Sequence, residues 1–211
     1  MQFSILFAIL ASTYMMAIAK RLPTLIQSFR YQSFFLSLAT FLAARHENSV
    51  ELLCVSILLF LLKVIAIPHL LLRIVRRIKA NENIGLFINT QLSLVCALVF
   101  TYVSWAFSRQ TLPAAGETQS FMFTVALSVI LTGGFLMIFR MKALTQIIGL
   151  LVMENGAFLL AALVSGGMPF FVEISIFFDV LISMIILGIF VYKINKLFTH
   201  IDVHKLTELK G

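Results

Sequence analysis

Four ionisable side chains lie inside long apolar stretches of the sequence: Lys63, Glu154, Glu173 and Asp179. An ionisable group that faces lipid at the middle of a bilayer costs roughly 2.5–3.5 kcal/mol. We therefore expect these side chains to face protein or water, to pair with one another, or to be neutral. Carboxyl groups in such surroundings can exchange protons near neutral pH. The four residues are thus candidates for an ion pathway.

Two hydroxyl residues extend this candidate pathway in the last apolar stretch. Ser175, Asp179 and Ser183 are spaced by four residues, so on a helix they would form one polar stripe about 12 Å long. Such hydroxyls can line a water path, although serines also bond back to their own helix. The competing interpretation is that the carboxyls only hold helices together, for example through a salt bridge with Lys63. We favour a pathway because Ser or Asn would join helices at a lower cost than four ionisable groups.

The elements that carry these residues are expected to be membrane-spanning helices. Of the 211 residues, 61% are hydrophobic and 12% charged, and the mean hydropathy is +1.04. Soluble domains have about 45–50% apolar and about 25% charged residues, so a soluble enzyme is excluded. The apolar runs also lack the alternation of membrane-barrel strands. The sequence predicts an all-α, polytopic membrane protein with seven spans near 3–19, 29–44, 52–72, 84–107, 119–139, 143–165 and 169–192.

The basic residues predict how these spans are oriented. Lys and Arg are enriched in the cytoplasmic loops of membrane proteins. With seven spans and the N-terminus outside, every Lys and Arg except Arg45, Arg109 and Lys63 falls in a cytoplasmic segment. We therefore expect an outer N-terminus and a cytoplasmic C-terminus. This placement accounts for the net charge of +7 through topology and contacts with anionic lipid, without a nucleic-acid partner.

The cysteines give no sign of a redox or metal centre. Cys54 and Cys96 both lie in apolar runs, where we expect inert buried thiols. The sequence contains no Cys-x-x-Cys motif and no Cys/His cluster with metal-ligand spacing. We expect no metal, no cofactor and no catalytic residue in this chain.

The last three expected helices resemble component E of hydrogenase-4-type complexes. The resemblance rests on Met153–Leu160, Gly167–Glu173 and Phe178–Leu181, which carry a Glu-Asn-Gly motif, then Pro and Val-Glu, then Phe-Asp. The same region is similar to the K subunit of respiratory complex I and to the C subunit of multisubunit cation/proton antiporters. The ending Thr207–Gly211 also resembles that of complex I K subunits, and Ile67–Arg73 resembles the family as well.

The resemblance implies a four-helix membrane region at 1–118 and a three-helix region with a cytoplasmic tail, similar to the K subunit, at 119–211. It implies that Glu154 and Glu173 belong to a polar route that couples redox chemistry elsewhere to proton or sodium movement. Asp179 and Lys63 join that route on physical grounds alone. The implied partners are antiporter-like membrane subunits, peripheral hydrogenase subunits that hold a NiFe centre and iron–sulfur clusters, and lipid. The implied location is a bacterial or archaeal cytoplasmic (inner) membrane.

These inferences together predict a non-catalytic membrane subunit of an energy-converting hydrogenase complex of the formate hydrogenlyase type. Such a chain would be part of an oxidoreductase complex without holding a redox centre. Two alternatives stay open: a subunit of a multisubunit cation/proton antiporter, and a purely structural scaffold of a membrane arm. The four helices that precede the K-like region favour component E over the three-helix K and C subunits.

Overall fold

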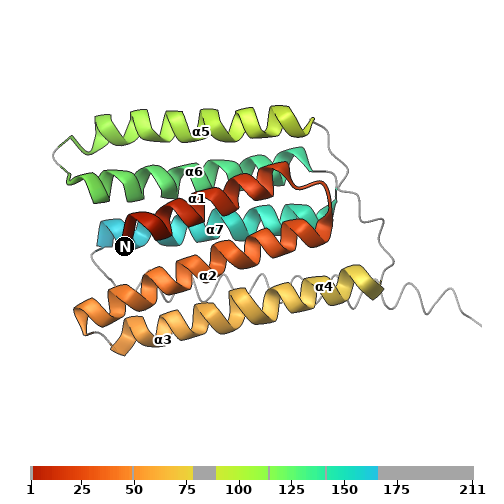
Figure 1. The fold of residues 1–211 in the computed structure, drawn as a ribbon, viewed down its shortest axis with the longest axis horizontal. Helices are drawn as coiled ribbons and strands as arrows, with labels where there is room; N and C mark the ends of the chain where they lie inside the picture. The colour runs from red at the N-terminus through yellow and green to blue at the C-terminus, as the bar shows by residue number, and fades with distance from the viewer. Residues whose placement is uncertain (1, 49, 78–88, 114, 141, 166–211) are drawn as a thin grey trace, which may run out of the picture.

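A computed structural model describes residues 2–48, 50–77, 89–113, 115–140 and 142–165, which form a helical bundle (Figure 1). No β-strand occurs among these residues, which confirms the all-α prediction for them. The elements in chain order are α1 (Gln2–Ile18), α2 (Leu22–Glu47), α3 (Val50–Leu59), the π-helix η1 (Phe60–Ala66), α4 (Ile67–Arg77), α5 (Thr90–Thr111), α6 (Glu117–Phe139) and α7 (Ala143–Ser165).

Four of the described helical segments are long and apolar enough to cross a membrane. They are Leu52–Arg76, Thr90–Thr111, Glu117–Phe139 and Leu144–Leu163, and α1 contributes a shorter apolar helix at Phe3–Ile18. The chain is therefore a multi-pass membrane protein, as predicted. The expected seventh span at 169–192 lies outside the described residues, so the total of seven spans stays a prediction.

The second helix is longer than the sequence predicts. A span at 29–44 is expected, whereas α2 runs from Leu22, with Pro23 in its first turn, to Glu47 before the left-handed Asn48. Its 26 residues extend about 39 Å. A stripe of polar side chains on α2 points into the bundle and is buried: Ser28, Gln32, Ser33, Ser37 and Thr40. This stripe lowers the local hydropathy, although lipid never meets it.

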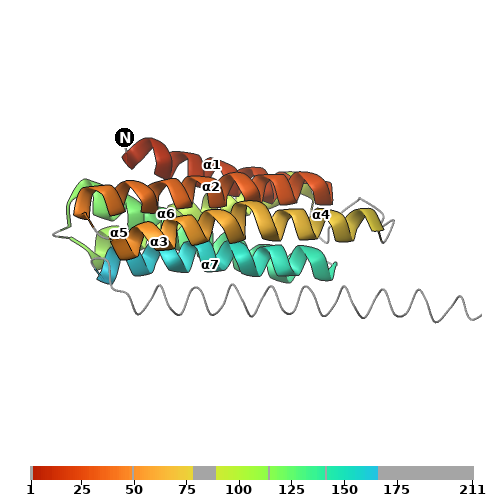
Figure 2. The same cartoon turned by 90° about the horizontal axis from the view of Figure 1, so that it is seen from below.

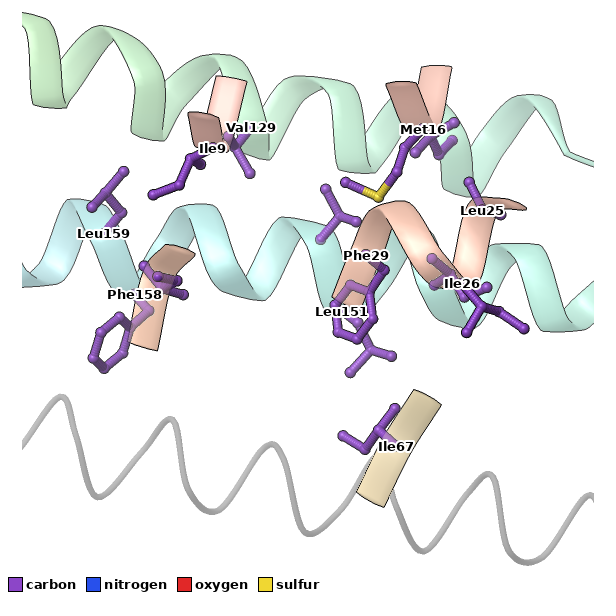
Figure 3. Close-up of a cluster of buried hydrophobic side chains, with 14 of the residues drawn as sticks. Ile9, Met16, Leu25, Ile26, Phe29, Ile67, Val129, Leu151, Phe158 and Leu159 are labelled. Atoms are coloured by element: carbon purple, nitrogen blue, oxygen red, sulfur yellow. The ribbon is translucent and has the colours of Figure 1, made fainter. Parts of the chain in front are cut away.

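The packing places α2 at the centre of one half of the bundle. It contacts α1, α3, η1, α4 and α7, whereas α6 contacts α1, α5 and α7. Figure 1 and Figure 2 both show α3, η1 and α4 as one continuous rod beside α2. Figure 3 shows the apolar core between them, with buried side chains from α1, α2, α4, α6 and α7: Ile9, Met16, Leu25, Ile26, Phe29, Ile67, Val129, Leu151, Phe158 and Leu159.

With α3, η1 and α4 taken as one rod, successive helical segments run in opposite directions, so the connections lie at the two ends of the bundle (Figure 1). One end holds the α1–α2 connection, the end of α4 and the α6–α7 connection, and it carries Lys20, Arg21, Arg73, Arg76, Arg140 and Lys142. The other end carries Arg45 and Arg109. This segregation agrees with the predicted loop assignment. Which end faces the cytoplasm stays a prediction.

Two further expectations concern the burial of the two thiols and the division of the chain into two regions. Cys54 is exposed on the bundle surface and Cys96 is partly exposed, so the expectation of buried thiols is wrong. The division into regions 1–118 and 119–211 stays a prediction. Helices on both sides of that boundary are in contact. The helix α6 packs on α1 and α5, and the helix α7 packs on α2.

Candidate functional site

Lys63 and Glu154 form a salt bridge inside the bundle. The Lys63 Nζ atom lies 3.0 Å from Glu154 Oε1, and the side chains are 1% and 11% exposed. Lys63 is at the centre of η1, and Glu154 is in the middle of α7, so the fold joins residues that are 91 positions apart. The structure therefore brings together two of the four ionisable residues that the sequence singles out.

A local change in helix geometry precedes Pro68 and contains Lys63. Proline has no N–H to donate, and in an α-helix its ring would collide with the carbonyl of Val64, four residues earlier. Here the backbone is a π-helix over Phe60–Ala66, and Ile67 N–H bonds to the carbonyl of Leu62, five residues earlier. A wider turn of this kind redirects side chains, and such turns are frequent at functional sites.

Glycines hold α7 in register against α6. A Cβ atom on Gly133 would lie 2.6 Å from the backbone nitrogen of Met153, and one on Gly149 would lie 2.7 Å from that of Met137. A Cβ on Gly156 would lie 2.8 Å from the carbonyl oxygen of Ala126. The two backbones are therefore in direct contact, as small residues permit in membrane helices. This contact fixes the height and rotation of α7, and with them the position of Glu154.

Asn155 is a second acceptor for the same ammonium group. Lys63 Nζ donates to Asn155 Oδ1 at 3.1 Å, and Asn155 Nδ2 donates to Gln32 Oε1 at 3.1 Å and to Ser33 Oγ at 3.2 Å. The amide is 2% exposed. Two neighbouring residues of α7, Glu154 and Asn155, thus accept hydrogen bonds from the lysine, and Asn155 also donates hydrogen bonds to α2.

The hydrogen bonds continue from α2 to α1. Gln32 Nε2 donates to Thr13 Oγ1 at 2.8 Å, and the Thr13 hydroxyl donates to the carbonyl of Ile9 at 2.8 Å. All these side chains are buried. Asn155, Gln32 and Thr13 are not among the site residues predicted from the sequence. The available signal is weak, because uncharged polar residues are common in these helices, although Asn155 follows Glu154 directly.

A buried ion pair of this kind indicates a functional site more strongly than it indicates a contribution to stability. Removing two charges from water costs several kcal/mol per ion, and their mutual attraction often only offsets that cost. A well-packed apolar pair would stabilise the bundle at least as well. The pair can change its charge when the carboxylate accepts a proton, whereas Gln32 and Asn155 have no ionisable proton in the physiological range.

The other predicted pathway residues lie outside the described residues. These are Glu173, Asp179, Ser175 and Ser183, and their roles stay predictions. His69 is exposed on α4, and its Nε2 lies 3.1 Å from Nη2 of Arg73. Within the described residues, no group of three or more His, Cys, Asp or Glu side chains is placed to hold a metal ion.

Arg140 has a structural role that is not predicted from the sequence. Its side chain is 1% exposed, and it donates to the carbonyls of Ala19 at 3.1 Å, Ala17 at 3.0 Å and Met16 at 3.4 Å. The last carbonyls of a helix lack partners within the helix and carry partial negative charge, so a guanidinium suits the end of α1. Burial lowers the pKa of Arg140 from its ordinary value to about 10. The residue therefore stays charged at neutral pH.

The helical bundle and its internal ion pair define a multi-pass membrane protein with a buried charged site. Similarity to known proteins identifies the family of this chain. The chain is 31% identical to hydrogenase-4 component E of Escherichia coli K12 over 186 residues, which cover 88% of this chain and 83% of that protein. The same values hold for the component E of Shigella flexneri. The chain therefore belongs to the hydrogenase-4 component E family.

The family assignment matches the resemblance found in the last three expected helices and extends it over most of the chain. An uncharacterized protein of Mycobacterium tuberculosis is 26% identical over 190 residues, covering 90% of this chain and 86% of that protein. No protein-family model matches the chain, and no solved structure matches it.

Proposed function

We propose that this chain is a non-catalytic membrane subunit of an energy-converting hydrogenase complex of the formate hydrogenlyase type. The name of the E. coli and Shigella relatives supports membership in such a complex. The partners in this proposal are antiporter-like membrane subunits and peripheral hydrogenase subunits that hold the NiFe centre and the iron–sulfur clusters. The location is the cytoplasmic membrane of a bacterium.

We propose that Glu154 and Lys63 belong to a proton or sodium pathway within that complex. The observation that carries this proposal is the buried salt bridge of 3.0 Å between η1 and α7. The salt bridge joins two separate helical segments. Lys63 lies in the π-helix η1, and Glu154 lies in α7. Glu173, Asp179, Ser175 and Ser183 extend the proposed pathway along the following span.

The proposed chemistry is a change of charge at Glu154. With the carboxylate ionised, the pair with Lys63 has no net charge. When Glu154 accepts a proton, the site has one positive charge, and the salt bridge is lost. A unit charge in a low-dielectric interior acts over a longer range than one at a solvated surface. Protonation of Glu154 therefore raises the energy of a second cation in a neighbouring subunit, and its release lowers that energy.

The test is ion transport by the assembled complex in proteoliposomes, measured per unit of complex. Glu154→Gln removes the titratable group, and we expect coupled transport to fall while the complex assembles. Glu117→Gln is the matched control, because Glu117 is an exposed carboxyl at the start of α6. Glu154→Asp keeps the charge on a shorter side chain, and we expect it to transport less per complex even if Glu154→Gln fails to assemble.

The two alternatives give different results in the same preparation. If the chain is only a scaffold, Glu154→Gln lowers the yield of complex, and transport per complex stays normal. If the chain serves an antiporter, purification through a tag on this chain recovers transporter subunits without hydrogenase subunits. Normal transport per complex in both Glu154 variants would remove this residue from the mechanism.

A further inference from the structure

We propose that the buried amides of Asn155 and Gln32 position Lys63, so that its ammonium stays in the site when Glu154 is neutral. This inference rests on the proposed function, because it concerns the same ion pair. Asn155 and Gln32 are positioning residues in this proposal, and neither transfers a proton.

The direction of the hydrogen bonds is set by the lysine. An ammonium group has donors and no acceptor, so the atom of Asn155 that faces it at 3.1 Å is the oxygen. The Asn155 nitrogen then faces Gln32 Oε1 at 3.1 Å, and the Gln32 nitrogen faces Thr13 Oγ1 at 2.8 Å. The Thr13 hydrogen is left for the carbonyl of Ile9. Every donor in this series points away from Lys63, and every acceptor points towards it.

This common direction gives the amides a defined effect on Lys63. Each carbonyl dipole has its negative end towards the ammonium, and hydrogen bonds in series polarise one another in a low-dielectric interior. Ser33 Oγ also accepts from Asn155 Nδ2 at 3.2 Å, which further limits rotation of the amide. The Asn155 oxygen is therefore held towards Lys63 by two contacts with α2.

The consequence appears when Glu154 takes up a proton. Glu154 Oε1 then no longer attracts the ammonium as a full negative charge, whereas Asn155 Oδ1 is unchanged. Lys63 stays in place, and the site alternates between no net charge and one positive charge. The amides also separate the pair from α1, because they hold no proton that can be passed on at physiological pH. Proton exchange with Glu154 accordingly uses a route other than Asn155, Gln32 and Thr13.

The elements packed against η1 and α7 carry further charged or titratable residues. These are Arg30, Arg45, His46 and Glu47 on α2, Glu51 on α3, and His69, Arg73, Arg76 and Arg77 on α4. Of these, Arg30, Arg45, His46, His69, Arg73 and Arg76 are exposed. Glu117 lies in the first turn of α6 and is exposed. A change in the titration of Glu154 after substitution of Asn155 therefore reports on the buried pair of Lys63 and Glu154.

Asn155→Leu tests the positioning role, with Ser37→Ala as the matched control. The leucine has a similar size and removes the acceptor for Lys63, whereas Ser37→Ala removes a buried hydroxyl of α2 that donates to the carbonyl of Phe34 in its own helix. Both are measured in the whole complex by the pH profile of coupled transport and by infrared titration of the Glu154 carboxyl. The carboxyl band is assigned by its loss in Glu154→Gln.

For Asn155→Leu we expect both midpoints to move to lower pH by about one unit, since protonating Glu154 then leaves Lys63 with one fewer acceptor. Ser37→Ala leaves both midpoints unchanged. A structural role alone would reduce the yield of complex and leave the infrared midpoint in place, which would overturn the proposal. If Asn155→Leu does not assemble, Gln32→Leu replaces it: this change removes the acceptor that orients the Asn155 nitrogen, and an unchanged infrared midpoint there contradicts the proposal.

The infrared readout separates the two proposals. A shifted carboxyl midpoint together with normal transport in Glu154→Gln supports the positioning of Lys63 and overturns the pathway. An unshifted midpoint together with lost transport in Glu154→Gln supports the pathway and overturns the positioning role.

Discussion

Gly133 and Gly149 face each other across the α6–α7 interface in a reciprocal contact. A Cβ atom on Gly133 would lie 2.8 Å from the carbonyl oxygen of Gly149, and one on Gly149 would lie 2.9 Å from the carbonyl oxygen of Gly133. A real Cβ atom does not approach backbone oxygen this closely without a shift. The interface that places Glu154 therefore depends on the absence of a methyl group at two positions.

Gly133→Ala is expected to destabilise the protein by about 1–3 kcal/mol, since the added methyl forces the two helices apart. Gly134→Ala is the matched control, because a Cβ at Gly134 meets no atom within 4 Å. Alanine favours helix by about 0.5–1 kcal/mol over glycine, so that variant should be as stable as the native protein or more so. Thermal unfolding of the purified protein in detergent measures both. Equal losses in the two variants would contradict the proposed close contact.

Pro68→Ala is expected to reduce transport per complex. The alanine restores an N–H that can bond to the carbonyl of Val64, so η1 can return to α-helical spacing and turn Lys63 away from α7. Proline inside a helix costs about 3 kcal/mol, but the gain from its removal is offset by the loss of the buried ion pair, which costs about 3–5 kcal/mol. Pro113→Ala, in the exposed connection between α5 and α6, is the control and should leave transport unchanged. Native transport in Pro68→Ala would show that transport does not depend on the π-helix.

Lys63→Met and Glu154→Gln are expected to be less stable as single variants than in combination. Each single change leaves a buried charge without the partner it has here, and breaking a buried pair in this way costs about 3–5 kcal/mol. The double variant removes both charges and can approach native stability. Unfolding temperatures of the four proteins form a double-mutant cycle. Additive losses would show that the two side chains do not interact, contrary to the 3.0 Å contact.

Arg140→Gln is expected to lower stability by about 2–4 kcal/mol, because three carbonyls at the end of α1 lose a charged donor. Arg140→Lys should give a smaller loss, since an ammonium keeps the charge without the planar fork of donors. Thermal unfolding at neutral pH measures the difference. Native stability in Arg140→Gln would show that the end of α1 needs no such cap.

The pH dependence of the same variant follows from the lowered pKa of Arg140. That pKa is lowered to about 10 in the folded protein and keeps its ordinary, higher value in the unfolded chain, so the unfolded chain binds more protons between the two values. Arg140 therefore makes stability rise with pH in that window and adds no slope below it. The stability difference between native protein and Arg140→Gln should be constant from about pH 6 to about pH 9 and should grow above about pH 10. A difference that grows as pH falls from 9 to 6 would contradict this assignment.

The success of the sequence predictions differs between elements for physical reasons. The expected spans at 119–139 and 143–165 agree closely with α6 and α7, since continuous apolar residues mark both. The span at 29–44 is too short because the buried polar stripe of α2 resembles a loop in hydropathy. Gly133 and Gly134 are equivalent in the sequence, and only the path of α7 distinguishes them.

The sequence by itself determined that this protein is a helical membrane protein and that Lys63 and Glu154 are ionisable residues in apolar surroundings. These conclusions follow from transfer free energies, which belong to each residue regardless of its neighbours. Only the tertiary structure decided that Lys63 meets Glu154 and Asn155, that Gln32 and Thr13 continue the contact, and that Arg140 caps α1. Such pairings depend on the rotation and depth of helices that are distant in sequence. Backbone contacts such as those between α6 and α7 fix these quantities, and hydropathy contains no information about them.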